Sequence, residues 1–103
     1  MTGKKMLSTE DAQLIGSQLR YIRNAFNLTT EWVAGETCLS EFTISNAERG
    51  HSVSKATCNH LLYFYLCLTS TYSDWLVRQP EFDSAMLKDA FDVIRTTLFS
   101  ATA

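Results

Sequence analysis

The sequence predicts an all-α protein, a bundle of five or six helices. Apolar residues recur at helical spacings of three and four, and hydroxyl or acidic residues suited to cap a helix precede these runs. In addition, residues 81–103 contain neither glycine nor proline. A chain of 103 residues that is 46% hydrophobic has the length of one domain and enough apolar material for a core.

The first helix is predicted over residues 9–26, after a loose arm at residues 1–7. Ser8 is placed to cap it. Its apolar face recurs at spacings of 4, 3 and 4 residues and consists of Ile15, Leu19, Ile22 and Phe26. Asn27 tolerates the left-handed conformation that ends a helix, so the first helix should stop there.

Residues 29–50 predict two short helices separated by a turn of about three or four residues. Thr29 can cap the first, which should end near Cys38, and Ser40 can cap the second. Gly50 is a natural residue to end that second helix. This arrangement is a helix-turn-helix, whose second helix can lie in the major groove of DNA.

Ser54 can cap a fourth helix that runs into the apolar segment LLYFYLCL at residues 61–68. A buried strand could carry the same eight residues, but the capping residue and the helical context favour a helix. The polar residues 69–73 then predict a boundary between a helix-turn-helix core, residues 8–68, and a C-terminal helical extension, residues 74–99. Both parts should belong to one compact domain.

The C-terminal extension should hold a short helix at residues 74–79, stopped by Pro80, and a last helix capped by Asp83. The last helix carries a narrow apolar stripe formed by Leu87, Phe91, Ile94 and Leu98. We expect this stripe to be a homodimer interface, since a dimer would match a two-fold symmetric DNA site. The alternative is that the stripe packs back on the fourth helix of the same chain.

Charge limits the expected affinity for DNA. The net charge is −2: residues 1–60 hold six basic and six acidic side chains, and residues 61–103 hold three and five. A nucleic-acid-binding domain usually carries a basic footprint, so nonspecific attraction should be weak. We expect a soluble cytoplasmic protein, because no segment resembles a signal peptide or reaches the length of a membrane span.

Chemical sites are not predicted. Cys58, His60 and Cys67 fit no closed zinc spacing and lack a fourth ligand. No glycine-rich phosphate loop or nucleophile motif occurs, and three cysteines without a CxxC pair indicate reduced thiols. We therefore expect no enzymatic activity, no metal and no cofactor.

Residues 12–66 resemble the Cro/repressor-type (XRE-type) helix-turn-helix regulators of phages and bacteria. The resemblance lies in LRYIRNAFNLTTEWVAGETCLSEFTISNAERG, which follows that family's order of L-R-x-x-R, G/N-L-S/T, E-x-x-A, I-S-x-x-T-I-S and E-x-G. The resemblance implies a bundle of four or five helices that works as a dimer on palindromic double-stranded DNA. It also implies that Arg23 and Glu48 form a buried ion pair between the first helix and the DNA-reading helix.

The resemblance also implies a set of DNA contacts. Thr29 and Thr30 match positions that grip phosphate at the start of the second helix. The base-reading positions are Ser40, Glu41, Phe42, Ser45 and Asn46, with Thr43 beside them. Backbone phosphates would be contacted just after the reading helix by Arg49, His51, Ser52 and Lys55.

Their chemistry suits base recognition. Asn46 can pair with adenine, Glu41 can accept from cytosine N4, and Phe42 can rest on a thymine methyl group. Two departures concern the turn: Thr37 stands where the family usually has leucine, and Cys38 where it usually has glycine. We therefore expect the turn to be distorted or longer than usual.

Three functions fit these features. The first is a sequence-specific transcriptional regulator, a dimeric repressor that binds a palindromic operator through a helix near residues 40–49. The second is an antitoxin-like autoregulator whose C-terminal region binds a toxin. The third is an adaptor that binds only protein, in which Glu41 and Phe42 contact another regulator.

Overall fold

The computed structural model describes residues 6–51 and 53–100, and this part of the chain forms six helices. They are α1 (Thr9–Ala25), α2 (Thr30–Thr37), α3 (Glu41–Arg49), α4 (Lys55–Thr71), α5 (Ser73–Val77) and α6 (Ser84–Ser100). Within these residues the only β contact is an isolated antiparallel bridge between Met6 and Ser54. The predicted all-α bundle is confirmed. No helix in the described ranges combines the length and the apolar character that crossing a membrane requires.

Hydroxyl caps begin four of the helices, as predicted. Each side-chain oxygen accepts a hydrogen bond from the backbone N–H three residues on, at 3.0–3.2 Å, and the caps are Ser8, Thr29, Ser40 and Ser54. Asp83 serves α6 in the same way, because its Oδ1 accepts from the N–H groups of Ala85 and Met86. Predicted arm residues 1–5 lie outside the described residues.

The predicted helix ends are also confirmed. Asn27, Cys38 and Gly50 adopt left-handed conformations with φ of 62°, 61° and 72°. At the end of α3 the N–H of Gly50 donates to the carbonyl of Ala47, and the N–H of His51 donates to the carbonyl of Asn46. This is the pattern of a Schellman motif. The chain therefore turns sharply at each end of the helix-turn-helix.

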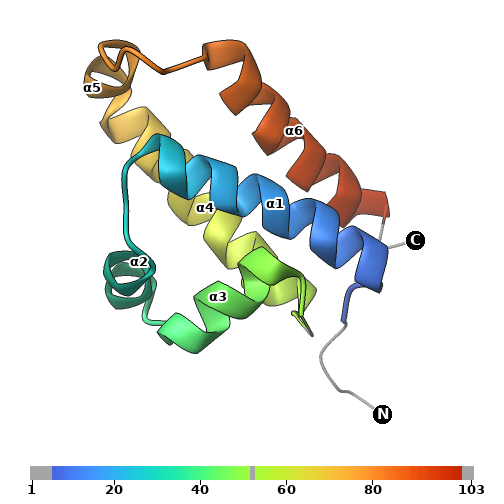
Figure 1. Ribbon diagram of the computed structural model, residues 1–103. Helices are drawn as coiled ribbons and strands as arrows, with labels where there is room; N and C mark the ends of the chain where they lie inside the picture. The colour runs from blue at the N-terminus through green and yellow to red at the C-terminus, as the bar shows by residue number, and fades with distance from the viewer. Residues whose placement is uncertain (1–5, 52, 101–103) are drawn as a thin grey trace.

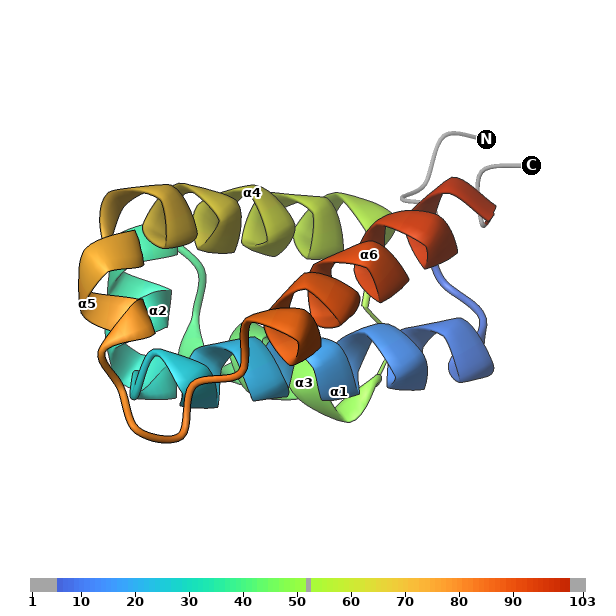
Figure 2. The ribbon, with the colours of Figure 1, turned by 90° about the horizontal axis from the view of Figure 1, so that it is seen from above.

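Helix α1 is the centre of the molecule. Figure 1 shows α3 on one side of α1 and α6 on the other, and Figure 2 shows α6 running obliquely above α1 and α4. The core side of α1 is buried along its length at Ala12, Ile15, Gly16, Leu19 and Ile22. The two helices that flank α1 therefore share one apolar core.

Two glycines allow α3 and its C-terminal turn to approach α1 closely. A Cβ atom on Gly16 would lie 2.5 Å from the carbonyl oxygen of Ala47 and 2.6 Å from that of Glu48. At Gly50 it would lie 2.7 Å from the Cα of Gln13. All three contacts are with backbone atoms, which cannot move aside as a flexible side chain can. The α1–α3 spacing thus depends on these two residues.

The apolar stripe of α6 is buried within one chain. Its four members are at most 8% exposed, and they are Leu87, Phe91, Ile94 and Leu98. Helix α6 packs chiefly on α1 and to a lesser extent on α4. The prediction that this stripe is a dimer interface is therefore wrong. The packing partner named in the alternative, the fourth helix, is only part of the surface that covers it.

The predicted polar break at residues 69–73 is mostly helical. Helix α4 continues to Thr71, and α5 begins at Ser73 after the single junction residue Tyr72. Thr69 is compatible with the helix because its hydroxyl donates to the carbonyl of Tyr65 at 2.9 Å. A polar composition therefore marked a surface-exposed helical segment here, not a loop.

Candidate nucleic-acid interface

The turn between α2 and α3 is short. Helix α2 ends at Thr37 and α3 begins at Glu41, which leaves residues 38–40 as the turn. Cys38 takes the left-handed conformation that glycine usually supplies, and the N–H of Leu39 bonds to the carbonyl of Ala34 at 3.1 Å. The expectation of a longer turn is wrong, because a cysteine adopts the required conformation.

Thr37 fits the core despite its hydroxyl group. The side chain is buried, and its Oγ1 donates to the carbonyl of Val33 at 2.7 Å. The Nε2 atom of His60 on α4 lies 3.0 Å from the carbonyl oxygen of Thr37. A carbonyl only accepts, so Nε2 carries the hydrogen and His60 helps to close the C-terminal end of α2.

The ion pair between Arg23 and Glu48 is confirmed and is bidentate. Arg23 Nε lies 2.6 Å from Glu48 Oε2, and Arg23 Nη2 lies 2.9 Å from Oε1. The third guanidinium nitrogen, Nη1, donates to the carbonyl of Leu28 at 2.7 Å. With side-chain exposures of 14% and 8%, the pair is largely withdrawn from water. One arginine therefore joins α1, the loop before α2, and α3.

The surroundings of this pair remain fixed in charge at neutral pH. The hydrogen bond to Glu48 raises the pKa of Arg23, although burial acts in the opposite direction. Burial raises the pKa of the Tyr65 phenol, and the charge of Glu48 adds to that effect while Arg23 opposes it. Tyr65 thus stays neutral, and Arg23 stays charged beside it.

The outer face of α3 carries five of the predicted DNA-contacting residues: Glu41, Phe42, Ser45, Asn46 and Arg49. At about 100° per residue they span about 140° of the helix. Ile44 and Ala47 lie on the opposite side and are buried. The structure therefore places these five side chains together on one side of the helix. Phe42 is 72% exposed.

Asn46 is held in one orientation on this face. Its Oδ1 accepts a hydrogen bond from Arg49 Nη2 at 3.0 Å, one turn further along the helix. Arginine only donates, so the amide oxygen must point toward Arg49 and the amide nitrogen away from it. The donor and acceptor of Asn46 are thus arranged before any ligand is present.

The start of α2 adjoins the start of α3. Thr30 Oγ1 lies 3.5 Å from Glu41 Oε1, a long hydrogen bond between exposed groups. The Thr29 hydroxyl oxygen caps α2 by accepting from the N–H of Trp32 at 3.0 Å. Thr30 therefore adjoins the outer face of α3, and the hydroxyl groups of both threonines already have partners within the chain.

Ser40 and Thr43 have mainly a structural role in the free protein. Ser40 Oγ accepts from the backbone N–H of Thr43 and also lies 2.9 Å from Thr43 Oγ1. Thr43 lies outside the 140° occupied by the outer face. These two predicted base-reading residues therefore serve chiefly to cap α3.

A hollow of about 360 Å³ lies next to α3. It is lined by Met6, Phe42, Thr43, Asn46, Val53, Ser54 and Thr57. Sequence reasoning missed Met6 and Thr57 as neighbours of the outer face. Met6 lay in a segment without a helical pattern, and Thr57 showed only the spacing of a capping partner for Ser54, which it is.

The remaining predicted phosphate contacts are less closely grouped. His51 is exposed directly after Gly50. Lys55 begins α4 but lines a different groove, between α4 and α6, together with Arg95. The structure therefore does not place Lys55 with the residues around Phe42. Ser52 lies outside the described residues.

A metal site is not formed by the cysteines and histidines in the part of the chain that the structure describes. Cys58 is fully buried, and burial raises the pKa of its thiol to about 12, so it remains protonated. His60 is engaged with Thr37, while Cys38 and Cys67 are exposed free thiols.

The candidate interface is thus the outer face of α3 with the N-terminal end of α2 beside it. Comparison of the chain with protein family models, with curated proteins and with solved structures finds no match. The interface carries few charges, chiefly Glu41 and Arg49 on α3. Its side chains offer hydrogen-bond donors, hydrogen-bond acceptors and one aromatic ring.

Proposed function

We propose that the protein is a sequence-specific DNA-binding transcriptional regulator, a repressor that places α3 in the major groove of a palindromic operator as a dimer. The observation that carries this proposal is the grouping of five polar or aromatic side chains on the outer face of α3. The inner face of the same helix is held by the Arg23–Glu48 pair and by the close contact at Gly16. A helix that is rigid on one side and chemically varied on the other is suited to reading bases.

Three side chains on the outer face, those of Asn46, Glu41 and Phe42, have chemistry that matches a base. Asn46, oriented by Arg49, can form two hydrogen bonds with adenine. Glu41 can accept from cytosine N4, and Phe42 can contact a thymine methyl group. The backbone N–H groups in the first turn of α2 can receive a phosphate, since a helix N-terminus attracts anions.

The dimer in this proposal needs a contact surface other than the α6 stripe, because the stripe is buried within each chain. Half-sites should lie about one helical turn apart, roughly 34 Å. Few basic residues adjoin α3, so each monomer should neutralise on the order of three to five phosphates, and the dependence of affinity on salt should be shallow.

Selection from a random duplex library with the full chain tests the proposal. We expect enrichment of a site with two inverted half-sites. The Asn46→Ala variant should enrich the same site with one position relaxed in each half. Recovery of only non-palindromic sites would contradict the dimeric arrangement, and the absence of any enriched sequence would contradict DNA reading by α3.

A second function is favoured by Phe42. An exposed aromatic ring beside a hollow that also contains Met6 and Val53 is typical of a protein-docking position. In this alternative the outer face of α3 binds another regulator and no DNA. Failure to enrich any duplex, together with binding of a purified regulator that Phe42→Ala abolishes, would favour this second function.

A further inference from the structure

A second concave site lies between α4 and α6. It has a volume of about 480 Å³, and it shares no lining residue with the hollow beside α3. This volume is within the range of sites that hold small organic ligands, roughly 300–1,000 Å³. The groove takes no part in the DNA-binding arrangement described above.

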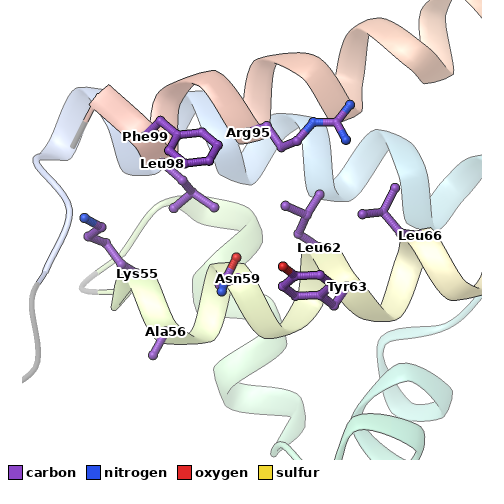
Figure 3. A pocket seen from close by; sticks show the side chains of 9 residues that line it. All are labelled: Lys55, Ala56, Asn59, Leu62, Tyr63, Leu66, Arg95, Leu98 and Phe99. Atoms are coloured by element: carbon purple, nitrogen blue, oxygen red, sulfur yellow. The ribbon is translucent and has the colours of Figure 1, made fainter. Parts of the chain in front are cut away.

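The floor of the groove is aliphatic. Leu62 and Leu66 point from α4 toward α6, and Leu98 points from α6 toward α4 (Figure 3). Two aromatic residues also line it: Tyr63 is 62% exposed and Phe99 is 74% exposed. Large apolar side chains are left in water here, so a ligand with an apolar body would gain by covering them.

The polar groups of the groove are basic or neutral. Lys55 lies at one end of the row of α4 side chains, Asn59 lies on α4 between Lys55 and Tyr63, and Arg95 extends from α6 (Figure 3). Among the described residues that line the groove, none is Asp or Glu. Two basic side chains in one groove are notable in a chain with a net charge of −2.

The guanidinium group of Arg95 already forms an ion pair, but this pair is weak. Its Nη2 donates to Asp92 Oδ1 at 2.8 Å, but both side chains are about half exposed. An exposed pair of this kind contributes little and exchanges readily. A ligand carrying a negative charge can therefore take over Arg95 at small cost.

A second copy of the chain fits this groove poorly. A two-fold contact brings the same surface of each subunit together, so Lys55 and Arg95 would face the basic groove of the partner. The charge instead favours an anionic occupant, and the small volume favours a small molecule.

We propose that the groove between α4 and α6 binds a small anionic amphiphile, a carboxylate with an aliphatic or aromatic body. The body lies against Tyr63 and Leu66, above the small exposed parts of Leu62 and Leu98 at the floor of the groove, and the head group pairs with Lys55 or Arg95. The Asn59 amide is placed to bind the head group as well. Lys55 then serves this ligand and not a DNA phosphate, and the site does not depend on the DNA-binding proposal.

The test is a titration of the full, isotope-labelled chain with decanoate, followed by amide NMR in the absence of DNA. Shifts should concentrate at residues 55–66 and 95–99 and should saturate. Decanol, which has the same chain length without the charge, should bind several-fold more weakly. Equal binding of the two probes, or shifts centred on the hollow beside Phe42, would overturn the proposal.

Variants distinguish binding in the groove from nonspecific hydrophobic binding elsewhere on the protein. The double variant Lys55→Gln, Arg95→Gln should weaken decanoate binding roughly fivefold, the effect of about 1 kcal/mol, while decanol binding stays unchanged. Tyr63→Glu should weaken both probes. Val77→Glu, which alters an exposed apolar residue on α5 outside the groove, is the matched control and should change neither.

Other occupants would give different results in the same samples. A dimer in sedimentation velocity that Tyr63→Glu dissociates would replace the amphiphile with a second copy of the chain. Co-sedimentation with phosphatidylglycerol vesicles, lost in Lys55→Gln, would replace it with a membrane surface. A monomer that ignores vesicles and binds decanoate supports the proposal.

Discussion

Helices α3 and α6 pack on opposite sides of α1, and they are held there by different forces (Figure 1). Helix α3 buries only Ile44 and Ala47, and its position depends on the backbone contact at Gly16 and the Arg23–Glu48 pair. Helix α6 is held by an apolar stripe that runs along its length. Apolar burial tolerates small shifts, whereas a bidentate ion pair and a backbone contact do not.

The two sides of α1 therefore have different structural roles. The side that must present a fixed outer face uses directional contacts, and the side that only needs covering uses apolar area. On the α6 side the surface feature is a groove with exposed aromatic rings, whereas the α3 side has an ordered polar face. The following variants break or sharpen this comparison, and they are ordered by expected effect.

Phe91→Ala should produce the largest loss, about 4 kcal/mol of unfolding free energy, because it empties a buried site between α6 and the core. Urea denaturation followed by circular dichroism measures the loss. Met86→Ala, on the exposed side of the same helix, is the control and should change stability by less than about 0.5 kcal/mol. If the Phe91→Ala loss disappeared at low protein concentration, the stripe would belong to a dimer after all.

Arg23→Met should lower stability by about 3 kcal/mol, because Glu48 is left largely buried without its partner. The double variant Arg23→Met, Glu48→Met should recover most of this and remain about 1 kcal/mol below the wild type, which reflects the lost bond to Leu28. Arg23→Met, Glu48→Met and the double variant are compared by the same urea denaturation. A double variant as unstable as the sum of the singles would show that the pair does not hold α3.

Gly16→Ala and Gly35→Ala form a matched pair of helical substitutions with opposite expected signs. At Gly16 the added methyl group meets two carbonyl oxygens of α3, and we expect a loss of about 2 kcal/mol. At Gly35 the added Cβ would meet no atom within 4 Å beyond its chain neighbours and the local backbone of α2. The higher helix propensity of alanine there should raise stability by about 0.5–1 kcal/mol. Losses of equal size at both positions would remove Gly16 from the description of the α1–α3 contact.

Cys38→Gly should give the smallest effect, a gain of about 0.5 kcal/mol. The left-handed conformation is unfavourable for an L-residue by roughly 1–2 kcal/mol, and the greater chain entropy of glycine offsets part of that. Thermal unfolding measures the gain. Cys67→Ala, at an exposed thiol on α4, controls for thiol oxidation and should leave stability nearly unchanged. A loss in Cys38→Gly would mean that the cysteine side chain itself stabilises the turn.

Much of the α1–α4 region could be predicted from the sequence because its signals are local. Caps at Ser8, Thr29, Ser40 and Ser54 and the left-handed ends are set by residues within a few positions of one another. The Arg23–Glu48 pair spans 25 positions and followed only from the resemblance to helix-turn-helix regulators.

The errors have a common cause. The apolar pattern of a helix predicts which of its faces is buried, but it does not predict which other element packs against that face. The stripe of α6 was correctly assigned as apolar, but neither periodicity nor spacing states that α1 is its main partner. The role of Gly16 had no local signal, because it depends on carbonyl groups some thirty residues away. The phosphate contact of Lys55 followed from the resemblance and stays a prediction, whereas its place in the lining of the α4–α6 groove had no signal in the sequence.

The most direct test of the central claim, that the outer face of α3 reads DNA, is the affinity of Asn46→Ala for the selected operator. Fluorescence anisotropy should show a loss of about 1–3 kcal/mol that is confined to operators with the base pair read by Asn46 intact. Asn24→Ala, at an exposed asparagine of α1, is the matched control and should bind as the wild type does. Equal losses in the two variants, or an Asn46→Ala loss that is the same on every duplex, would contradict base reading by α3.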